Sequence, residues 1–163
     1  MKKLSLLAAT LILSVVGSAA QAQVISQRSI GLDAANRIAA ATVKACADKG
    51  YAVTATVVDR AGLIRAVQRA DNAGPHTLAA SQAKAYTSAS ARNATSAMLE
   101  TSQKNPGAAN LGDIPGFLVL GGGVPVKAGD EVIGAVGVGG APGGHLDEQC
   151  AVAGIEAAAE LLK

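Results

Sequence analysis

The alternation of apolar and polar residues predicts a helix near each end of the chain, with strands between them. Apolar residues recur at helical spacing over residues 32–49 and again over 146–163. Residues 51–58 are rich in β-branched side chains, which is typical of a strand. A short turn containing a glycine leads from there into a second strand over 63–69, so these two strands are expected to form a hairpin.

The middle of the chain predicts two more helices and three more strands. Pro75 suits the first turn of a helix, which is expected over residues 76–90 and is followed by a second helix over 93–103. Residues 104–113 are expected to form a loop. The three strands are predicted over residues 116–120, 124–128 and 131–138.

The element order α-β-β-α-α-β-β-β-α predicts an α+β fold. Hairpin turns on both sides of the middle helices favour a central antiparallel sheet of about five strands. The helices would cover its faces. The sequence shows no internal repeat and no low-complexity linker, so residues 23–163 are expected to form one domain.

Residues 1–22 have the pattern of a secretory signal peptide. Lys2 and Lys3 precede an apolar run, and the small residues at 20 and 22 predict cleavage before Gln23. The alternative, a membrane anchor, is disfavoured because the run is short for a span of about 20 residues. We therefore expect a periplasmic or secreted protein with no membrane insertion after cleavage.

Charge and composition give no support for nucleic acid as a partner. The chain has 14 basic and 12 acidic residues, and removal of Lys2 and Lys3 would leave 12 of each. The aromatic residues number only three, Tyr51, Tyr86 and Phe117, which supply a poor stacking surface for bases.

Ten glycines fall within residues 121–144, directly before the last predicted helix. The spacing fits neither a dinucleotide fingerprint nor a phosphate-binding P-loop. Turns and places of close backbone approach explain most of these glycines. The start of the last helix, at Gly143 and Gly144, could also hold an anionic group, although Asp147 and Glu148 already complement the helix dipole there.

The two cysteines, Cys46 and Cys150, lie on the first and last predicted helices. A disulfide between them fits an oxidising compartment and would close a loop of about 100 residues. The alternative is two buried cysteines that act as small apolar residues. The disulfide requires the two terminal helices to lie side by side.

Several stretches together resemble one known family. They are VVDRAGLIRAVQRADNAGPHT, the KAYTSA that follows it, and IPGFLVLGGGVPVKAGDEVIGAVGVGGAPGGHLDEQCAVAG. As a set they are similar to the GlcG/HbpS haem-binding (or haem-degrading) domain family, which includes the C-terminal domain of PduO-type proteins. The resemblance covers residues 29–162.

The resemblance implies a profilin-like fold and a homo-oligomer. It would place the first and last helices on one face of the sheet, which favours the disulfide. It also implies haem as the cofactor. Together with the expected signal peptide, it predicts an exported protein that senses, stores or handles haem or iron.

An imidazole ligand to haem iron must come from His76 or His145, the two histidines of the chain. His76 is the preferred ligand, because Lys84 and Thr87 continue its helical face with a cation for a propionate and a hydroxyl. Arg69, at the end of the second strand, is a further propionate candidate. The alternative for His76 is simple packing at a helix start, and His145 is expected to be an exposed helix-start residue.

The glycine-rich segment adds Gly122, Gly143 and Gly144 as candidate ligand contacts. An alternative function is a non-haem module that binds an organic acid at residues 121–123 and at the start of the last helix. A third is an accessory oligomer without a ligand. The sequence contains no recognisable hydrolase or metalloprotease motif, so catalytic residues are not predicted.

Overall fold

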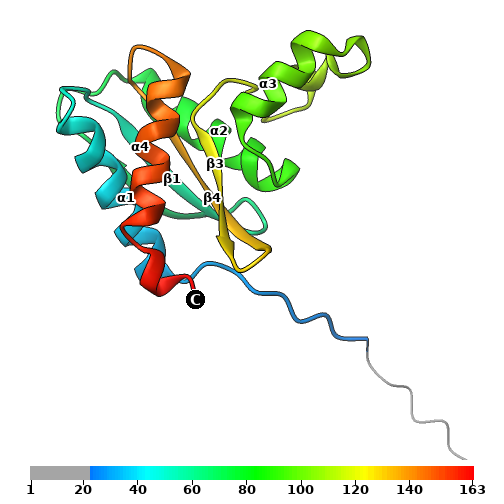
Figure 1. Cartoon of the computed structure of the whole chain (residues 1–163), viewed down its shortest axis with the longest axis horizontal. Helices are drawn as coiled ribbons and strands as arrows, with labels where there is room; N and C mark the ends of the chain where they lie inside the picture. The colour runs from blue at the N-terminus through cyan, green and yellow to red at the C-terminus, as the bar shows by residue number, and fades with distance from the viewer. Residues whose placement is uncertain (1–22) are drawn as a thin grey trace, which may run out of the picture.

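The computed structural model describes residues 23–163, and the expected signal peptide lies outside this range. The secondary structure comprises four α-helices and four strands within the described residues (Figure 1). The helices are α1 (Leu32–Ala47), α2 (His76–Ala91), α3 (Thr95–Lys104) and α4 (Gly144–Glu156). The strands are β1 (Thr54–Asp59), β2 (Ile64–Arg69), β3 (Gly123–Ala128) and β4 (Glu131–Gly139).

The strands form one antiparallel sheet in the order β2-β1-β4-β3. The central strands β1 and β4 pair over six residues, from Thr54 opposite Gly139 to Asp59 opposite Gly134. The turn between β3 and β4 contains Gly129 with φ +62°, a backbone conformation that glycine adopts without strain. The predicted α+β fold with a central antiparallel sheet is confirmed.

The strand expected over residues 116–120 is wrong, since that segment is irregular and the sheet has four strands rather than about five. Gly116 has φ +83°, which breaks the extended conformation at its first residue. The backbone N–H of Leu118 donates to Thr87 Oγ1, and that of Leu120 donates to the carbonyl of Leu118. The donors that a strand would offer to a neighbour are therefore used elsewhere.

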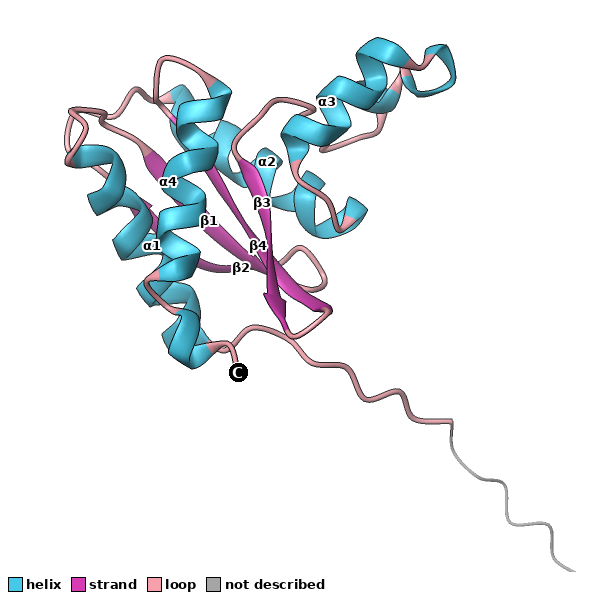
Figure 2. Ribbon diagram, in the orientation of Figure 1, coloured by secondary structure: helices cyan, strands magenta, loops and turns pink. Residues whose placement is uncertain are grey.

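Helices cover both faces of the sheet (Figure 2). The helices α1 and α4 pack side by side on one face, and α2 packs on the other. The larger apolar core lies between the sheet and the α1–α4 pair, and it includes Ile38, Val57, Val136 and Val138. Helices α2 and α4 therefore lie on opposite faces of the same sheet.

The α2 face of the sheet is packed through small and polar residues. Gly137 on β4 meets the helix directly, because a Cβ at this position would lie 2.1 Å from the backbone oxygen of Ser81. Beside it, Thr56 Oγ1 and Ser81 Oγ are 2.8 Å apart, and both side chains are buried. The glycines of β4 thus allow a helix backbone to approach the strand.

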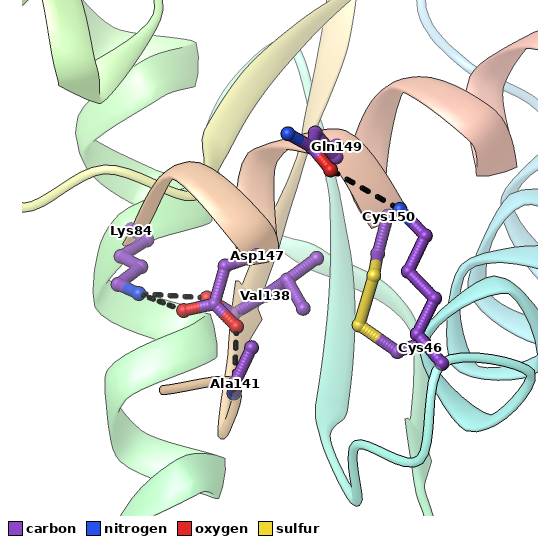
Figure 3. The surroundings of a disulfide bond; sticks show 8 residues. Cys46, Lys84, Val138, Ala141, Asp147, Gln149 and Cys150 are labelled. Atoms are coloured by element: carbon purple, nitrogen blue, oxygen red, sulfur yellow. Dashed lines mark hydrogen bonds and ion pairs between the residues drawn. A yellow bond between two sulfur atoms is a disulfide. The ribbon is translucent and has the colours of Figure 1, made fainter. Parts of the chain in front are cut away.

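The first and last helices are joined by a disulfide between Cys46 and Cys150, with a Cα–Cα distance of 5.4 Å (Figure 3). Close packing of the helices makes this possible. A Cβ at Gly154 of α4 would lie 1.9 Å from Thr42 Oγ1 of α1. The predicted pairing is confirmed, and both sulfurs are buried.

The last helix is shorter than the sequence pattern predicts. It starts at Gly144 and ends at Glu156, and a short 3₁₀ helix, Ala159–Leu161, replaces the expected continuation to Lys163. This tighter turn still buries Ala158 and Leu162 against the core. Within the described residues, no helix has the length and apolar character required to span a membrane.

Candidate functional site

A buried ion pair joins the two helix layers at the end of β4 (Figure 3). Lys84, from the middle of α2, places its Nζ 2.8 Å from Oδ2 of Asp147, in the first turn of α4. The same ammonium donates to the carbonyl oxygen of Val138 at 2.8 Å. The other oxygen of Asp147 accepts a hydrogen bond of 3.0 Å from the backbone N–H of Ala141. Both carboxylate oxygens of Asp147 therefore have a donor inside the protein, and the Lys84 ammonium has two acceptors.

Burial raises the pKa of the Asp147 carboxyl above its usual value. The Lys84 ammonium and the Ala141 N–H favour the charged carboxylate and act in the opposite direction. Removal of a carboxylate from water is costly unless a partner compensates it, and Lys84 is the compensating charge here. The pair is thus a charged link between α2 and α4.

The candidate residues Lys84 and Gly122 are brought together by the fold. Gly122 has φ +117°, and a Cβ there would lie 3.0 Å from Lys84 Nζ and 2.8 Å from Asp147 Cβ. Lys84 is only 2% exposed and its ammonium is bound by Asp147, so it does not present a charge to a surface-bound propionate.

Gly143 and Gly144 lie where the loop before β3 touches the start of α4. Gly121 and Gly144 approach so closely that a Cβ at Gly121 would lie 3.1 Å from the backbone carbon of Gly144. Gly143 is the N-terminal cap of α4, and its carbonyl accepts from the N–H groups of Leu146 and Asp147. Close approach of two backbones accounts for the glycines at 121 and 144.

His76 and Arg69 lie near each other at one end of the sheet. His76 is the first residue of α2, is exposed, and has its ring beside Gly74. Arg69, the last residue of β2, donates to the carbonyl of Ala73, three residues before His76. Both side chains therefore contact the segment that links β2 to α2, Arg69 at Ala73 and His76 at Gly74.

The predicted stripe along α2 does not share one environment. Lys84 lies two turns beyond His76, about 12 Å along the helix axis, and is buried. Thr87 is also buried; its hydroxyl donates to the carbonyl of Ala83 and accepts from the N–H of Leu118. The fold therefore separates the exposed His76 from the buried Lys84 and Thr87.

A cleft of about 700 Å³ lies between α3 and α4. Helix α3 reaches away from the sheet (Figure 1), and its side chains form one wall of the cleft. Apolar side chains supply most of its exposed surface: Leu99 from α3, Leu120 from the loop before β3, and Val152 and Ala153 from α4. Polar side chains stand between them, among them Ser96, Gln103, Gln149 and Glu156. Leu120 and Val152 are 45% and 40% exposed, so apolar side chains stand uncovered here.

His145 and Glu148 add polar groups to this cleft. They are three residues apart in the first turns of α4, and residues at that spacing lie on one helix face. Glu148 Oε2 is buried without any hydrogen-bond partner. A carboxylate oxygen hidden from water normally has a donor, so this wall offers an unused acceptor.

The sequence patterns did not indicate this cleft. Its two helices lie about 50 residues apart in the chain, and only the fold brings Leu99 opposite Val152. The signal that was available is weak: Val152 is apolar but lies outside the stripe of Ala151, Ile155 and Ala158 that faces the core. Over residues 23–163, no cluster of three or more His, Cys, Asp or Glu residues could hold a metal ion.

Comparison with known proteins identifies the family. Among curated protein sequences none matches the chain significantly. Among solved structures, a double mutant of HbpS from Streptomyces reticuli is 37% identical with a TM-score of 0.74, over 91% of this chain and 97% of that one. The ORFY protein of Klebsiella pneumoniae is 29% identical with a TM-score of 0.79, over 86% and 98% of the two chains.

A third structure, the haem complex of PduOC, shares the fold at 20% identity and a TM-score of 0.70, over 79% and 94% of the two chains. The model of the family described as "Haem degrading protein HbpS-like" matches residues 30–156. The chain therefore belongs to the HbpS-like haem-degrading protein family.

Proposed function

We propose that this protein is an exported, oligomeric haem-binding protein that handles haem or iron. The observation that carries the proposal is the cleft of about 700 Å³ between α3 and α4. Its apolar lining and its imidazole match what a flat, apolar, iron-bearing ligand requires. The family membership and a haem complex with the same fold support the same ligand class.

The scarcity of aromatic residues does not oppose this function. Aliphatic side chains from two helices supply the apolar surface instead, and the cleft is open on one side. A porphyrin could rest its apolar ring on the helices while its propionates face water. Charged carboxylates favour that arrangement, because water compensates them best.

The proposed export rests on residues 1–22 and on the disulfide. Structural disulfides persist in oxidising compartments and are rare in reducing ones, and Cys46 and Cys150 are paired. Cell fractionation with mass spectrometry of the recovered protein tests this. A chain that starts at Gln23 in the periplasm or medium is expected, and an uncleaved protein in the cytoplasm would contradict export.

The proposed oligomer is supported by the exposed edge of the sheet. Strand β2 is an edge strand, and Ile64 and Val67 are exposed on it, next to the exposed Leu63. Uncovered apolar residues on an edge favour association with a second copy. Light scattering is expected to give a mass of at least two chains, and Ile64→Lys is expected to lower it.

The haem function is tested by titration of the tag-free protein with haem, followed by its Soret band. Saturation at one haem per chain is expected. A weak change that never saturates would refute haem binding. Because a histidine tag itself ligates haem, the protein should carry none.

A further inference from the structure

We infer that haem lies in the cleft between α3 and α4 and that His145, rather than His76, is its iron ligand. This inference rests on the proposed haem binding and specifies its site. It differs from the expectation drawn from the sequence, which preferred His76 for the side chains that follow it on α2. The surroundings of the two histidines decide between them.

The apolar surface is found beside His145. The side chains of Leu99, Leu120 and Val152 line the same cleft as this imidazole. A cleft of about 700 Å³ lies within the usual range for sites that hold molecules of this size, roughly 300–1,000 Å³. A porphyrin that enters it would bring its metal within reach of a histidine on the wall.

The surroundings of His76 are polar. The residue after it, Thr77, is buried and its hydroxyl lies 2.7 Å from that of Thr54. Arg69 is nearby, but its guanidinium donates to the carbonyl of Ala73. Lys84 and Thr87, which the sequence suggested as further contacts for haem on this helix face, are buried further along α2, and Lys84 is bound by Asp147. His76 therefore has a cation nearby but no apolar wall built from its own helix.

Glu148 provides a second, independent reason to prefer His145. A histidine that ligates a metal usually donates its other ring N–H to a carboxylate or carbonyl, which fixes the ring and strengthens the ligand. Glu148 Oε2 is buried without a partner, one helical turn from His145 on the same wall. Glu148 thus has the chemistry of a positioning residue for this imidazole.

The cleft lining carries three glutamates, Glu100, Glu148 and Glu156, and one lysine, Lys49, so the propionates of a bound porphyrin must lie in water or beside the lysine. Glu100 on α3 is paired with Lys104, which reduces its repulsion. Lys49 also lines the cleft and, apart from its hydrogen bond of 3.1 Å to Gln149, is exposed. Among the lining residues, Lys49 carries the ammonium that could pair with a propionate.

Two porphyrins distinguish binding in the cleft from ligation of the iron by His145. Haem reports on both, whereas metal-free protoporphyrin IX reports on the cleft alone through its fluorescence. His145→Ala is expected to weaken haem binding about tenfold or more and to shift the Soret band, and to leave the metal-free porphyrin bound as in the unchanged protein. Added imidazole should restore the Soret position. His76→Ala is the matched control and should behave as the unchanged protein with both ligands.

Val152→Glu introduces a carboxylate into the apolar wall, and it should weaken the binding of both porphyrins by a similar factor. Glu148→Gln should retain haem but lower the frequency of the iron–imidazole stretch in the ferrous protein. A purely structural residue would not move that band.

The inference is overturned if His76→Ala, and not His145→Ala, loses the Soret shift. It is equally overturned if Val152→Glu binds both porphyrins normally, or if neither histidine matters to a protein that saturates with haem. Failure of the unchanged protein to saturate with haem would instead refute the proposed function itself.

Discussion

Lys84 and Asp147 form an ion pair across the molecule, from helices that cover opposite faces of the sheet. Their side chains are 3% and 4% exposed, and the distance between Nζ and Oδ2 is 2.8 Å. The residues are 63 positions apart, and their contact fixes α2 and α4 relative to the end of β4. His145, on the α4 wall of the cleft, lies two residues before Asp147, so this pair also holds the part of α4 that carries His145.

The Lys84→Met variant should lose much of the stability of the protein. The substitution keeps the volume of the side chain but leaves the Asp147 carboxylate buried without its charge partner. Loss of one member of a buried pair typically costs about 3–5 kcal/mol of unfolding free energy. Urea denaturation followed by circular dichroism measures this loss.

The exposed pair Lys104–Glu100 is the matched control, because it has the same charges at the surface of α3. Lys104→Met should leave the urea midpoint almost unchanged, since exposed pairs contribute little. Replacement of both buried partners, as Lys84→Met with Asp147→Leu, should recover most of the loss. An equal loss in the single and double variants would show that the charge of Asp147 is not the cause.

Stability should depend on the charge state of Asp147. Its folded pKa is raised above the ordinary value of 3.8, so between these two values the folded state holds more protons than the unfolded state. Stability contributed by this group therefore falls as the pH rises through that window and is constant above it. The advantage of the unchanged protein over Asp147→Asn should shrink as the pH rises above the ordinary value of 3.8, and it should then level off. An advantage that grows over this range would mean that the folded pKa is depressed.

The order of the elements was predictable from the sequence because it depends on local patterns. The β-branched residues of β1 and the helical spacing of α1 act within a few positions. The segment 116–120 has the same local pattern but does not form a strand, because its backbone is bound by a residue that is distant in the sequence. The hydroxyl of Thr87, about 30 residues earlier, accepts the backbone N–H of Leu118.

The site could be predicted only in part, for the same reason. Lys84 was recognised as a cation, but its spacing from His76 on the helix gave no sign of Asp147, which arrives from another layer. The disulfide was left open by the residues alone, because pairing of Cys46 with Cys150 requires two distant helices to meet. The cleft depends on the way α3 leaves the body of the protein, which no pattern within α3 encodes.

Removal of the disulfide should lower stability substantially. The bond closes a loop with a sequence separation of 104, and loss of such a constraint typically costs about 2–5 kcal/mol. The double variant Cys46→Ala with Cys150→Ala avoids free thiols and tests this in urea. The unchanged protein in the presence of a reductant should reach the same midpoint once the bond has opened. A double variant as stable as the oxidised protein would show that close packing of α1 and α4 is sufficient by itself.

Gly137→Ala should force α2 away from the sheet. A Cβ at this position would lie 2.1 Å from the oxygen of Ser81 and 2.4 Å from the backbone nitrogen of Ala85, and neither backbone atom can rotate aside. We expect a loss of at least about 2 kcal/mol in unfolding free energy, since overpacked positions that require backbone shifts typically cost 1–3 kcal/mol. Gly112→Ala is the control, because a Cβ there meets no atom within 4 Å, and its midpoint should stay close to that of the unchanged protein. Equal midpoints for the two variants would mean that α2 can move off β4 at no cost, and that its position on the sheet is not fixed by this glycine.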